Sequence, residues 1–356
     1  MKIGQTINGY TVVGVDGKDF STKGGGLSTW TFARKGGVDY FMKEFLSPTY
    51  PLDSSPGSHK LKEKKKRDCL KFENHNKALI TKVFKSVSTR SDLIFTRDFF
   101  RYNTKYYKVT EKIDVSSISY KEISRLPIQK RLLIIKTVSH SLEILHKLCI
   151  VHGDLKLNNI LIKKTDGGYY TSKLIDFDDS YFEFQPPSIR DEVVGDPVYY
   201  SPELENYILD KNDSIGSDLS CKSDIFALGI IFCQYLTGLL PDGVPVDKYP
   251  SHIVNNGGVI SIANSIELPN ELIGLVNSML LKNAKDRPSI SEIFTLLKSI
   301  SSIHDISHIH GVIKDSAVDT IKNSDKINPL TKNVFERNVI KMNDRLTISM
   351  GFKKNK

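Results

Sequence analysis

The stretch V-H-G-D-L-K-L-N-N at 151–159 gathers an acid, an amine and two amides within a few residues. The carboxylate of Asp154 can receive or orient a proton, the amine of Lys156 can hold an anion, and the amide of Asn159 can bind a hard cation. Phosphoryl transfer needs such groups, because it depends on placing the phosphates, neutralising their charge and receiving the hydroxyl proton. The stretch therefore indicates chemistry on phosphates.

Two other segments carry groups of the same kind. Lys43 lies in the strand-like run Y-F-M-K-E-F, which follows the glycine-rich turn K-G-G-G-L-S-T-W at 23–30. Glycine lets backbone N–H groups approach phosphates closely. A strand lysine is ordinarily an exposed charge and G-G-G a plain flexible loop, but the order of turn, strand and lysine favours a phosphate site. Asp176, in K-L-I-D-F-D, adds a second carboxylate for a metal ion.

The elements expected to position these groups change in type along the chain. About the first hundred residues contain short runs rich in β-branched and aromatic residues, separated by glycine clusters. The strands predicted from these runs cover 11–15, 30–34, 40–45, 93–100 and 106–113. Between them, apolar residues near helical spacing predict a helix over 68–84.

Beyond about residue 115 the pattern becomes helical, with helices predicted at 127–148, 224–237, 270–280 and 291–300. The second of these is apolar nearly all round, so it should be a buried central helix. The polar cluster begins just after the first. A small strand-rich half thus precedes a large helical half, and a cleft between the two is the natural place for a nucleotide.

Bulk composition narrows the class of protein. Hydrophobic residues make up 39% and charged residues 26% of the 356 residues, which is typical of a soluble globular protein. The sequence has no apolar run of the roughly 20 residues that a membrane helix needs, and its N-terminus lacks the apolar core of a signal peptide. We therefore expect a cytoplasmic protein without a membrane span. The four scattered cysteines favour reduced, mostly buried thiols over a disulfide or metal site.

The net charge of +9 raises the question of an anionic partner. Much of it lies in one run, H-K-L-K-E-K-K-K-R at 59–67, in which no aromatic residues are interleaved. A solvated loop or a first helical turn explains this run better than a nucleic-acid stripe does. We expect no nucleic-acid partner, and the remaining positive charge suits an enzyme that handles polyanionic nucleotides.

Taken together, these motifs resemble those of a eukaryotic-type (Hanks-type) Ser/Thr protein kinase domain, from about residue 10 to about residue 300. The variant is bacterial-like, with H-G-D and D-F-D where most members have H-R-D and D-F-G. The resemblance implies a bilobal α+β fold with a small β-rich N-lobe over 1–114 and a larger helical C-lobe over 115–300. Residues 301–356 are polar and basic, without strong periodicity, and are interpreted as a tail.

The resemblance also implies roles for the polar groups. Asp154 would be the catalytic base, and Lys156 would steady the γ-phosphate of ATP. Lys43 would contact the α- and β-phosphates. Asn159 and Asp176 would bind Mg²⁺. The implied substrates are ATP and proteins with Ser or Thr acceptors, since the D-L-K-x-x-N form favours Ser/Thr over Tyr.

The nucleotide would be covered and held by further residues. The phosphates would lie under the turn that contains Gly24, Gly25, Gly26 and Ser28. The adenine would be bound by the gatekeeper Thr110, the hinge residues Glu111 and Ile113, and the floor residue Leu161. Two large residues depart from the family pattern, because Trp30 replaces the usual valine and Phe41 the usual alanine. We expect a narrower or shifted adenine pocket.

The family also pairs the strand lysine with a glutamate on the following helix. Alignment places His75 at that position, with Glu73 two residues earlier. Two residues are more than half a helical turn, so both cannot face Lys43. We expect Glu73 to be the partner, because a carboxylate is needed to orient the lysine.

Three features of the helical half extend the resemblance. G-D-P-V-Y-Y-S-P-E at 195–203 is similar to the segment that ends a kinase activation loop. Arg287 lies where the family supplies an ion-pair partner for Glu203. Asp224 matches the buried aspartate that ties the central helix to the catalytic loop, as a buried carboxylate requires partners.

Two alternatives remain open. A small-molecule kinase of the aminoglycoside or choline kinase type would carry H-G-D-L and I-D-F-D-D, and both segments occur here, but Lys156, Glu203, Asp224 and Arg287 favour a protein kinase. A nucleotide-binding pseudokinase scaffold would have lost groups that this chain keeps. One residue favours the scaffold: Asp196 replaces the threonine that normally hydrogen-bonds the catalytic aspartate.

Gly153 stands where most protein kinases have an arginine that pairs with a phosphorylated activation-loop residue. Without that arginine, phosphate on Ser180 or Ser188 has less to bind. We expect activity that does not require phosphorylation of the loop.

Overall fold

The computed structural model describes residues 1–22, 28–86, 93–94, 96–113, 116–186, 195–209, 219–263 and 268–300, without the side chains of Phe84 and Ser86. Residues Met1–Ser301 form one compact unit. The predicted tail over 301–356 and the boundary between lobes at 114–115 lie outside the described residues.

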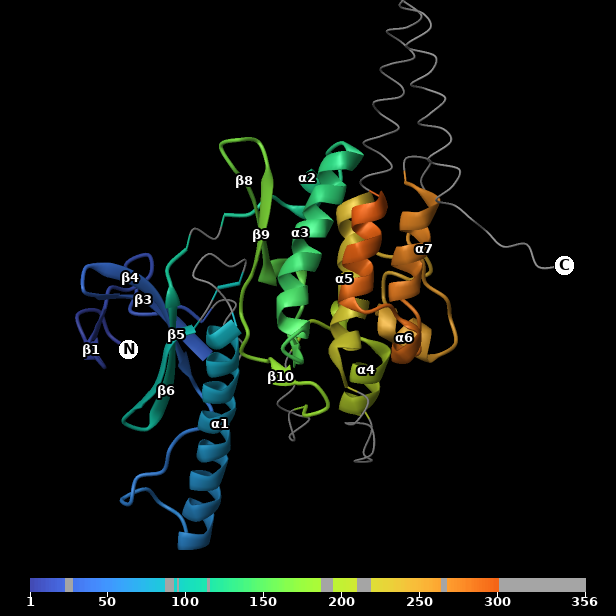
Figure 1. The fold of residues 1–356 in the computed structure, drawn as a ribbon. Helices are drawn as coiled ribbons and strands as arrows, with labels where there is room; N and C mark the ends of the chain where they lie inside the picture. Colours follow the sequence, from blue (N-terminus) through green and yellow to red (C-terminus); the bar gives the residue numbers. More distant parts are fainter. Residues whose placement is uncertain are drawn as a thin grey trace, which may run out of the picture. The chain divides into compact units, whose positions relative to one another are not determined.

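The N-terminal half is built on a six-stranded antiparallel sheet with the order β1-β2-β3-β4-β6-β5 (Figure 1). The strands are β1 (Thr6–Ile7), β2 (Tyr10–Val12), β3 (Ser28–Lys35), β4 (Val38–Phe45), β5 (Thr96–Tyr102) and β6 (Lys105–Glu111). Side chains alternate between the two faces of a strand. One face buries the apolar cluster Ile7, Tyr10, Val12, Ala33, Met42, Tyr107 and Val109. The other face carries Lys43.

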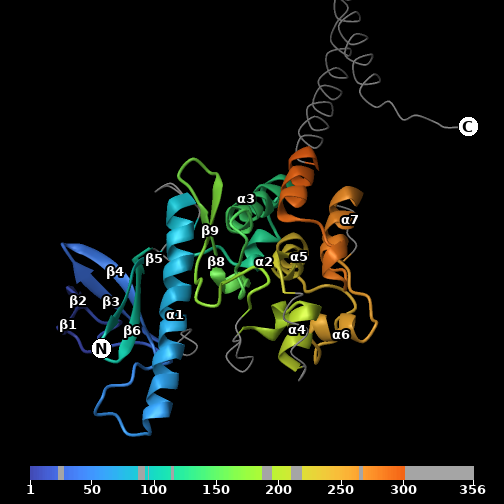
Figure 2. The same ribbon diagram turned by 60° about the horizontal axis from the view of Figure 1, so that its bottom comes forward.

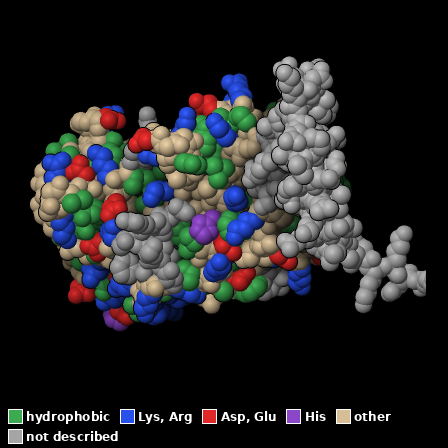
Figure 3. Space-filling view, turned by 45° about the horizontal axis from the view of Figure 1, so that its top comes forward, with side chains coloured by type: hydrophobic (Ala, Val, Ile, Leu, Met, Phe, Trp, Pro, Cys, Tyr) green, Lys and Arg blue, Asp and Glu red, His purple; other side chains and the backbone are tan. Residues whose placement is uncertain are grey.

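Helix α1 (His59–Ser86) lies between the sheet and the helical half, as both ribbon views show (Figures 1 and 2). It packs on the sheet through Phe72, whose ring lies 5.2 Å from that of Phe45 and 5.3 Å from that of Tyr106. The helix predicted from Asp68 begins at His59, so the basic run forms its first turns. On the face seen in Figure 3, Lys and Arg side chains are interspersed with Asp and Glu.

The C-terminal half is helical, as predicted. Its helices are α2 (Tyr120–Ile123), α3 (Ile128–His146), α4 (Pro202–Leu209), α5 (Cys221–Thr237), α6 (Pro250–Asn255) and α7 (Asn270–Met279), with a further helical run at 290–300. Nearly every side chain of α5 is buried, which confirms the predicted central helix. Its N-cap Ser220 accepts a hydrogen bond from the Lys222 backbone, and Gly238 ends it in the left-handed conformation at φ 79°.

Short elements that the periodicity did not predict lie between α3 and α5. They are β7 (Ile150–Val151), β8 (Ile160–Lys164), β9 (Tyr170–Leu174) and β10 (Tyr181–Phe182), and the 3₁₀ turns Leu157–Asn159 and Pro197–Tyr199; a third turn, Ala284–Asp286, follows α7. Strand β7 pairs with β10, and β8 with β9. These two ribbons hold the catalytic-loop segment and the D-F-D segment beside each other. The backbone N–H of Ile175 donates to the carbonyl of Asn159 at 3.0 Å.

These findings give the bilobal α+β architecture that the sequence predicted. None of the helices within the described ranges is long and apolar enough to cross a membrane.

Candidate active site

Two groups of the catalytic loop converge on the carboxylate of Asp154. Lys156 Nζ lies 2.6 Å from Asp154 Oδ2. The side-chain nitrogen of Asn159 donates to the same oxygen at 3.0 Å and to the Asp154 carbonyl at 2.8 Å. Since this nitrogen is used within the loop, the amide oxygen of Asn159 is the atom offered to a cation. The spacing read from the sequence therefore corresponds to a real cluster.

Asp224 fixes the backbone of this loop from the buried helix α5. Its carboxylate accepts hydrogen bonds from the backbone N–H groups of His152 at 2.7 Å and Gly153 at 3.2 Å, and its Oδ2 lies 2.9 Å from Nε2 of His146. The predicted tether is thus confirmed, and the buried carboxylate has the partners that it requires. Burial lowers the pKa of His152, although the charges of Asp224 and Asp154 act in the opposite direction.

Lys43 meets the D-F-D segment, which comes from the other half of the fold. Its Nζ lies 3.2 Å from Asp176 Oδ1 and forms a shorter ion pair with Asp178 Oδ2. Asp178 also forms an ion pair with Lys108, whose Nζ lies 2.6 Å from Asp178 Oδ1. The side chains of Lys43, Lys108 and Asp178 are only 10%, 9% and 12% exposed. Asp178 and both lysines are therefore largely shielded from water, whereas Asp176 is 33% exposed at the edge of the same cluster.

These contacts shift the titration of each carboxylate differently. Burial acts to raise the pKa of Asp178, but Lys108 and Lys43 outweigh it, and the pKa falls well below its usual range. Burial and the neighbouring charge of Asp178 raise the pKa of Asp176. Burial acts to lower the pKa of Lys43, and Asp178 and Asp176 overcome it, so this pKa is raised. The negative charge thus resides most firmly on Asp178.

Another carboxylate, that of Asp179, follows directly in the chain. Burial, together with the charges of Asp178 and Asp154, raises the pKa of Asp179 to about 7.

The prediction that Glu73 pairs with Lys43 is wrong in this structure. Glu73 accepts a hydrogen bond from the Tyr106 hydroxyl at 2.8 Å and lies 3.3 Å from Lys77 Nζ and 3.9 Å from Arg101 Nε. These partners belong to the outer end of the sheet and to the helix itself.

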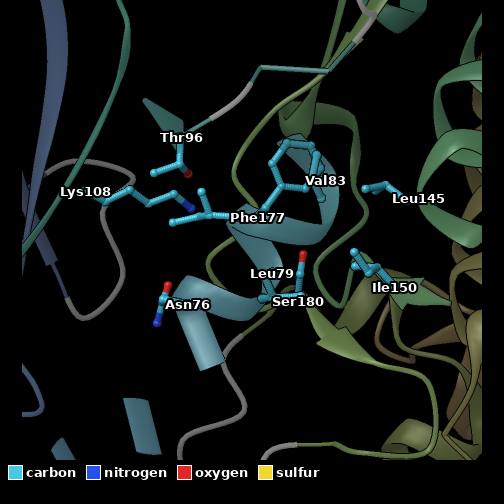
Figure 4. Close-up of a pocket in the computed structure, with 10 residues that line it drawn as sticks. Asn76, Leu79, Val83, Thr96, Lys108, Leu145, Ile150, Phe177 and Ser180 are labelled. Atoms are coloured by element: carbon cyan, nitrogen blue, oxygen red, sulfur yellow. The ribbon is translucent and has the colours of Figure 1, made fainter. Parts of the chain in front are cut away.

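His75, the alternative, points into the helical half instead. Its Nε2 lies 2.9 Å from the Ser180 carbonyl. Among the α1 side chains that line the same cavity as Lys108 and Phe177, the polar one is the neutral Asn76 (Figure 4).

Asp178 and Lys108 are the two members of this ion-pair cluster that the sequence did not predict. Asp178 was identified only as a replacement for the glycine of D-F-G. Lys108 lies in Y-Y-K-V-T, where alternation with Tyr107 and Val109 ordinarily indicates a charge on the solvent face of a strand. The sequence therefore contained no clear signal that this lysine is buried and paired with a carboxylate.

The residues predicted to surround the adenine lie on β3, β4, β6 and β8, apart from Ile113, which follows β6. Thr110 is paired in register with Phe41. The rings of Trp30 and Phe41 lie 5.2 Å apart, and Phe32 packs against both, 5.7 Å from Trp30 and 6.5 Å from Phe41. The three rings therefore form an aromatic cluster on the lysine-bearing face of the sheet.

The other residues predicted to bind the nucleotide differ in their exposure. Leu161 is buried in β8, and Ile113 is half-buried. Glu111 is exposed and ion-paired with Arg97. Ser28 is buried at the start of β3, whereas Gly24, Gly25 and Gly26 lie outside the described residues.

A buried ion pair anchors the segment 195–203, which follows the D-F-D segment in the chain. Both terminal nitrogens of Arg287 lie 2.8 Å from the two carboxylate oxygens of Glu203. Arg287 also donates to the carbonyls of Lys222, Leu281 and Lys282 and is fully buried. The predicted pair is confirmed, with the two-pronged geometry that a guanidinium gives a carboxylate.

The model of the protein kinase domain family matches residues 59–296, two thirds of the chain. The chain belongs to the protein kinase family. The matched part includes the catalytic loop, the D-F-D segment and the Glu203–Arg287 pair. Lys43 precedes it, so its assignment depends on the contact with Asp176 in the structure.

Curated relatives are protein kinases of several kinds. The dual specificity protein kinase TTK of Mus musculus is 28% identical over 263 residues, which are 66% of this chain and 29% of the relative. The serine/threonine-protein kinase zyg-8 of Caenorhabditis elegans is 30% identical over 146 residues, 40% of this chain and 17% of the relative. Pkn1, a serine/threonine-protein kinase of Myxococcus xanthus, is 32% identical over 110 residues, 30% of this chain and 15% of the relative. The chain thus spans less than a third of the length of these relatives.

Within the kinase family, Gly153 is a departure that the structure explains. It has φ 82°, and a Cβ atom at this position would lie 2.2 Å from the Asp179 carbonyl oxygen. A side chain therefore cannot be added unless the D-F-D-D segment moves. Ser180 in that segment is buried and donates its hydroxyl to the His152 carbonyl at 2.9 Å. Ser188, the other residue considered for phosphorylation, lies outside the described residues.

Asp196, the second departure in this kinase domain, uses its carboxylate locally. It caps the Pro197–Tyr199 turn by accepting from the Val198 backbone N–H at 3.0 Å. It also lines a cavity together with Asp154, Gly153 and Tyr200. The cap gives a structural reason for the aspartate.

Proposed function

We propose that this chain is an ATP- and Mg²⁺-dependent protein kinase that transfers the γ-phosphoryl group to Ser or Thr hydroxyls of proteins. The observation that carries the proposal is the contact of Lys43 with Asp176 beside an intact catalytic loop. The two residues are 133 positions apart in the sequence, yet Nζ and Oδ1 lie 3.2 Å apart. Phosphoryl transfer is mostly positioning and charge stabilisation, and these residues provide both.

Asp154 is the proposed base. Lys156 and Asn159 both hold its Oδ2, which leaves Oδ1 to receive the proton of the attacking hydroxyl. The tether from Asp224 keeps this loop in place. Lys156 is close enough to Asp154 to contact the incoming phosphoryl group as well as the base.

Asp176 and Asn159 are the proposed metal residues. A carboxylate and an amide oxygen are hard donors of the kind that Mg²⁺ prefers, with the remaining positions taken by phosphates and water. Bound there, Mg²⁺ would neutralise the charge that develops on the phosphates. Lys43 adds a fixed positive charge for the α- and β-phosphates.

The base of ATP is proposed to bind against the aromatic cluster of Trp30, Phe32 and Phe41. Leu161 would form the opposite wall, and Thr110 with the backbone at Glu111 and Ile113 would bound its edge. The turn with Gly24, Gly25, Gly26 and Ser28 is proposed to cover the phosphates. Aromatic rings suit a planar base, since stacking is tolerant of base identity.

A protein acceptor is favoured by the Glu203–Arg287 pair. This pair anchors the end of the activation segment, which small-molecule kinases lack. A small-molecule acceptor remains the second candidate, because Gly153 in H-G-D-L lies close against the backbone of Asp179, the last aspartate of I-D-F-D-D, and both segments are shared with that class.

The test is incubation with γ-labelled ATP and Mg²⁺, comparing wild type with Asp154→Asn. Label on Ser or Thr of protein acceptors, lost in the variant, is the expected result. Choline and aminoglycosides are offered in parallel reactions. Label only on these small molecules would replace the proposal by the second candidate, and ATP binding without transfer to any acceptor would make the chain a scaffold.

A further inference from the structure

Asp178 links two lysines that lie side by side on the sheet. Lys43 on β4 and Lys108 on β6 are directly opposite each other in the antiparallel register. Both point to the D-F-D segment, and each contacts a different oxygen of the Asp178 carboxylate. One carboxylate therefore fixes both ammonium groups.

The apolar surroundings of Lys108 explain why it needs a carboxylate partner. Figure 4 shows Lys108 extending toward Phe177 in a cavity that is otherwise lined mainly by apolar side chains of α1, α3 and β7. Removing a lysine from water is costly unless a carboxylate neutralises it in good geometry. The two lysines and the two aspartates Asp176 and Asp178 balance in charge. No phosphate-binding role is proposed for Lys108, and the ion pair that it forms within the described residues is with Asp178.

Helix α1 does not provide the carboxylate that the family places there. Glu73 is held by Tyr106 and Lys77, and His75 by the backbone of Ser180. Asn76, whose side chain lines the cavity that contains Lys108, is neutral and donates to the Phe72 carbonyl at 3.0 Å. Asp176 contacts Lys43 too, but its proposed task is to bind the metal ion.

We propose that Asp178, held by Lys108, orients Lys43 for ATP in place of a glutamate on α1. Asp178 is thus a positioning residue, and the inference rests on the proposed function. It makes the alignment of Lys43 depend on the segment that bears Asp176, two residues away, and not on the placement of α1. Lys108 keeps the carboxylate aimed at Lys43 when Asp176 is engaged elsewhere.

The test compares two carboxylate-to-amide changes of the same size, Asp178→Asn and Glu73→Gln. In Asp178→Asn we expect kcat/KM for ATP to fall about 100-fold, because a misplaced lysine no longer meets the phosphates. Glu73→Gln should change it less than about threefold, because its partners are not at the site. KM for the protein substrate should stay the same in both. A large loss in Glu73→Gln with a small one in Asp178→Asn would overturn the inference.

Asp178→Asn leaves two buried lysines with one carboxylate, so it carries a risk of misfolding. The double variant Lys108→Met/Asp178→Asn restores the balance of charge while Lys43 still lacks its partner. It should unfold at a temperature close to that of wild type and keep the same loss in kcat/KM. Wild-type activity in this folded double variant would contradict the proposal.

A rescue variant separates positioning from general damage. Asp178→Gly with Asn76→Glu recreates D-F-G and places a carboxylate on α1 in the cavity with Lys108. We expect it to recover at least about tenfold of the activity that Asp178→Gly loses. Normal activity of Asp178→Gly alone would show that Lys43 needs no carboxylate from either source. A loss in Asp178→Gly that Asn76→Glu does not reverse would count against the interchange of the two carboxylates.

Binding of Mg²⁺-ATP, measured by calorimetry, distinguishes failure of the inference from failure of the proposed function. If wild type binds ATP and transfers nothing, the kinase proposal fails, while weaker binding in Asp178→Asn than in Glu73→Gln still supports the role of Asp178. Equal binding by the two variants would overturn it whether or not the protein is active.

Discussion

The catalytic loop and the site of Lys43 fulfil their tasks in different ways. In the loop, Asp154, Lys156 and Asn159 follow the family pattern residue by residue, and one buried aspartate of α5 fixes their backbone. Around Lys43 the family's task remains, but the carboxylate comes from the D-F-D segment and not from α1. The chain therefore follows the family pattern in the catalytic loop and departs from it in the carboxylate that faces Lys43.

The largest effect should come from the region that follows the pattern. Asp154→Asn removes the proposed base while an amide oxygen still accepts from Lys156. We expect kcat to fall about 1000-fold, within the range for general base catalysis, with an unchanged unfolding temperature. Steady-state phosphorylation and thermal melting measure the two quantities. An Asp154→Asn variant that keeps more than a tenth of the wild-type kcat would show that Asp154 is not the catalytic base.

Arg287→Met tests whether the helical half is held as the family pattern implies. It leaves Glu203 buried without its two-pronged partner, which should lower the free energy of unfolding by about 3–5 kcal/mol. Urea denaturation followed by circular dichroism measures this. Arg287→Met combined with Glu203→Leu should recover much of the loss, and equal damage in the double variant would mean that the pair itself is not the cause.

Gly153→Ala sharpens the comparison where the two regions meet. The added methyl group would collide with the Asp179 carbonyl, 2.2 Å from the ideal Cβ position, and push the D-F-D-D segment away from the loop. We expect kcat/KM to fall about 100-fold, because Asp176 moves relative to Asp154. An active Gly153→Arg protein that gains dependence on loop phosphorylation would show that the glycine only removed a regulatory contact.

The sequence was sufficient for residues whose partners lie nearby or on strongly patterned elements. The two-lobe order, the buried α5 and the cluster around Asp154 all followed from periodicity and spacing. The α1 residue that faces Lys43 could not be derived from the sequence. Which side of α1 turns toward the sheet depends on how Phe72 and Asn76 pack, and both Glu73 and His75 carry polar groups that could contact a lysine. The ribbons β7–β10 and β8–β9 were too short to show a period.

The smallest effect is expected for Asp196→Thr. Threonine can still cap the Pro197–Tyr199 turn, although more weakly than aspartate, and it removes one carboxylate from the cavity shared with Asp154. The rate should change by about two- to fivefold without loss of fold. Initial rates across a pH series check this, and an identical rate at every pH would show that Asp196 acts only as a cap.

The most direct measurement of the central claim is a crystal structure with Mg²⁺ and a non-hydrolysable ATP analogue. The account predicts that Lys43 Nζ contacts the α- and β-phosphates while it remains ion-paired with Asp178, which is itself still paired with Lys108. A structure in which α1 has turned to bring Glu73 to Lys43, with Asp178 released from both lysines, would contradict it.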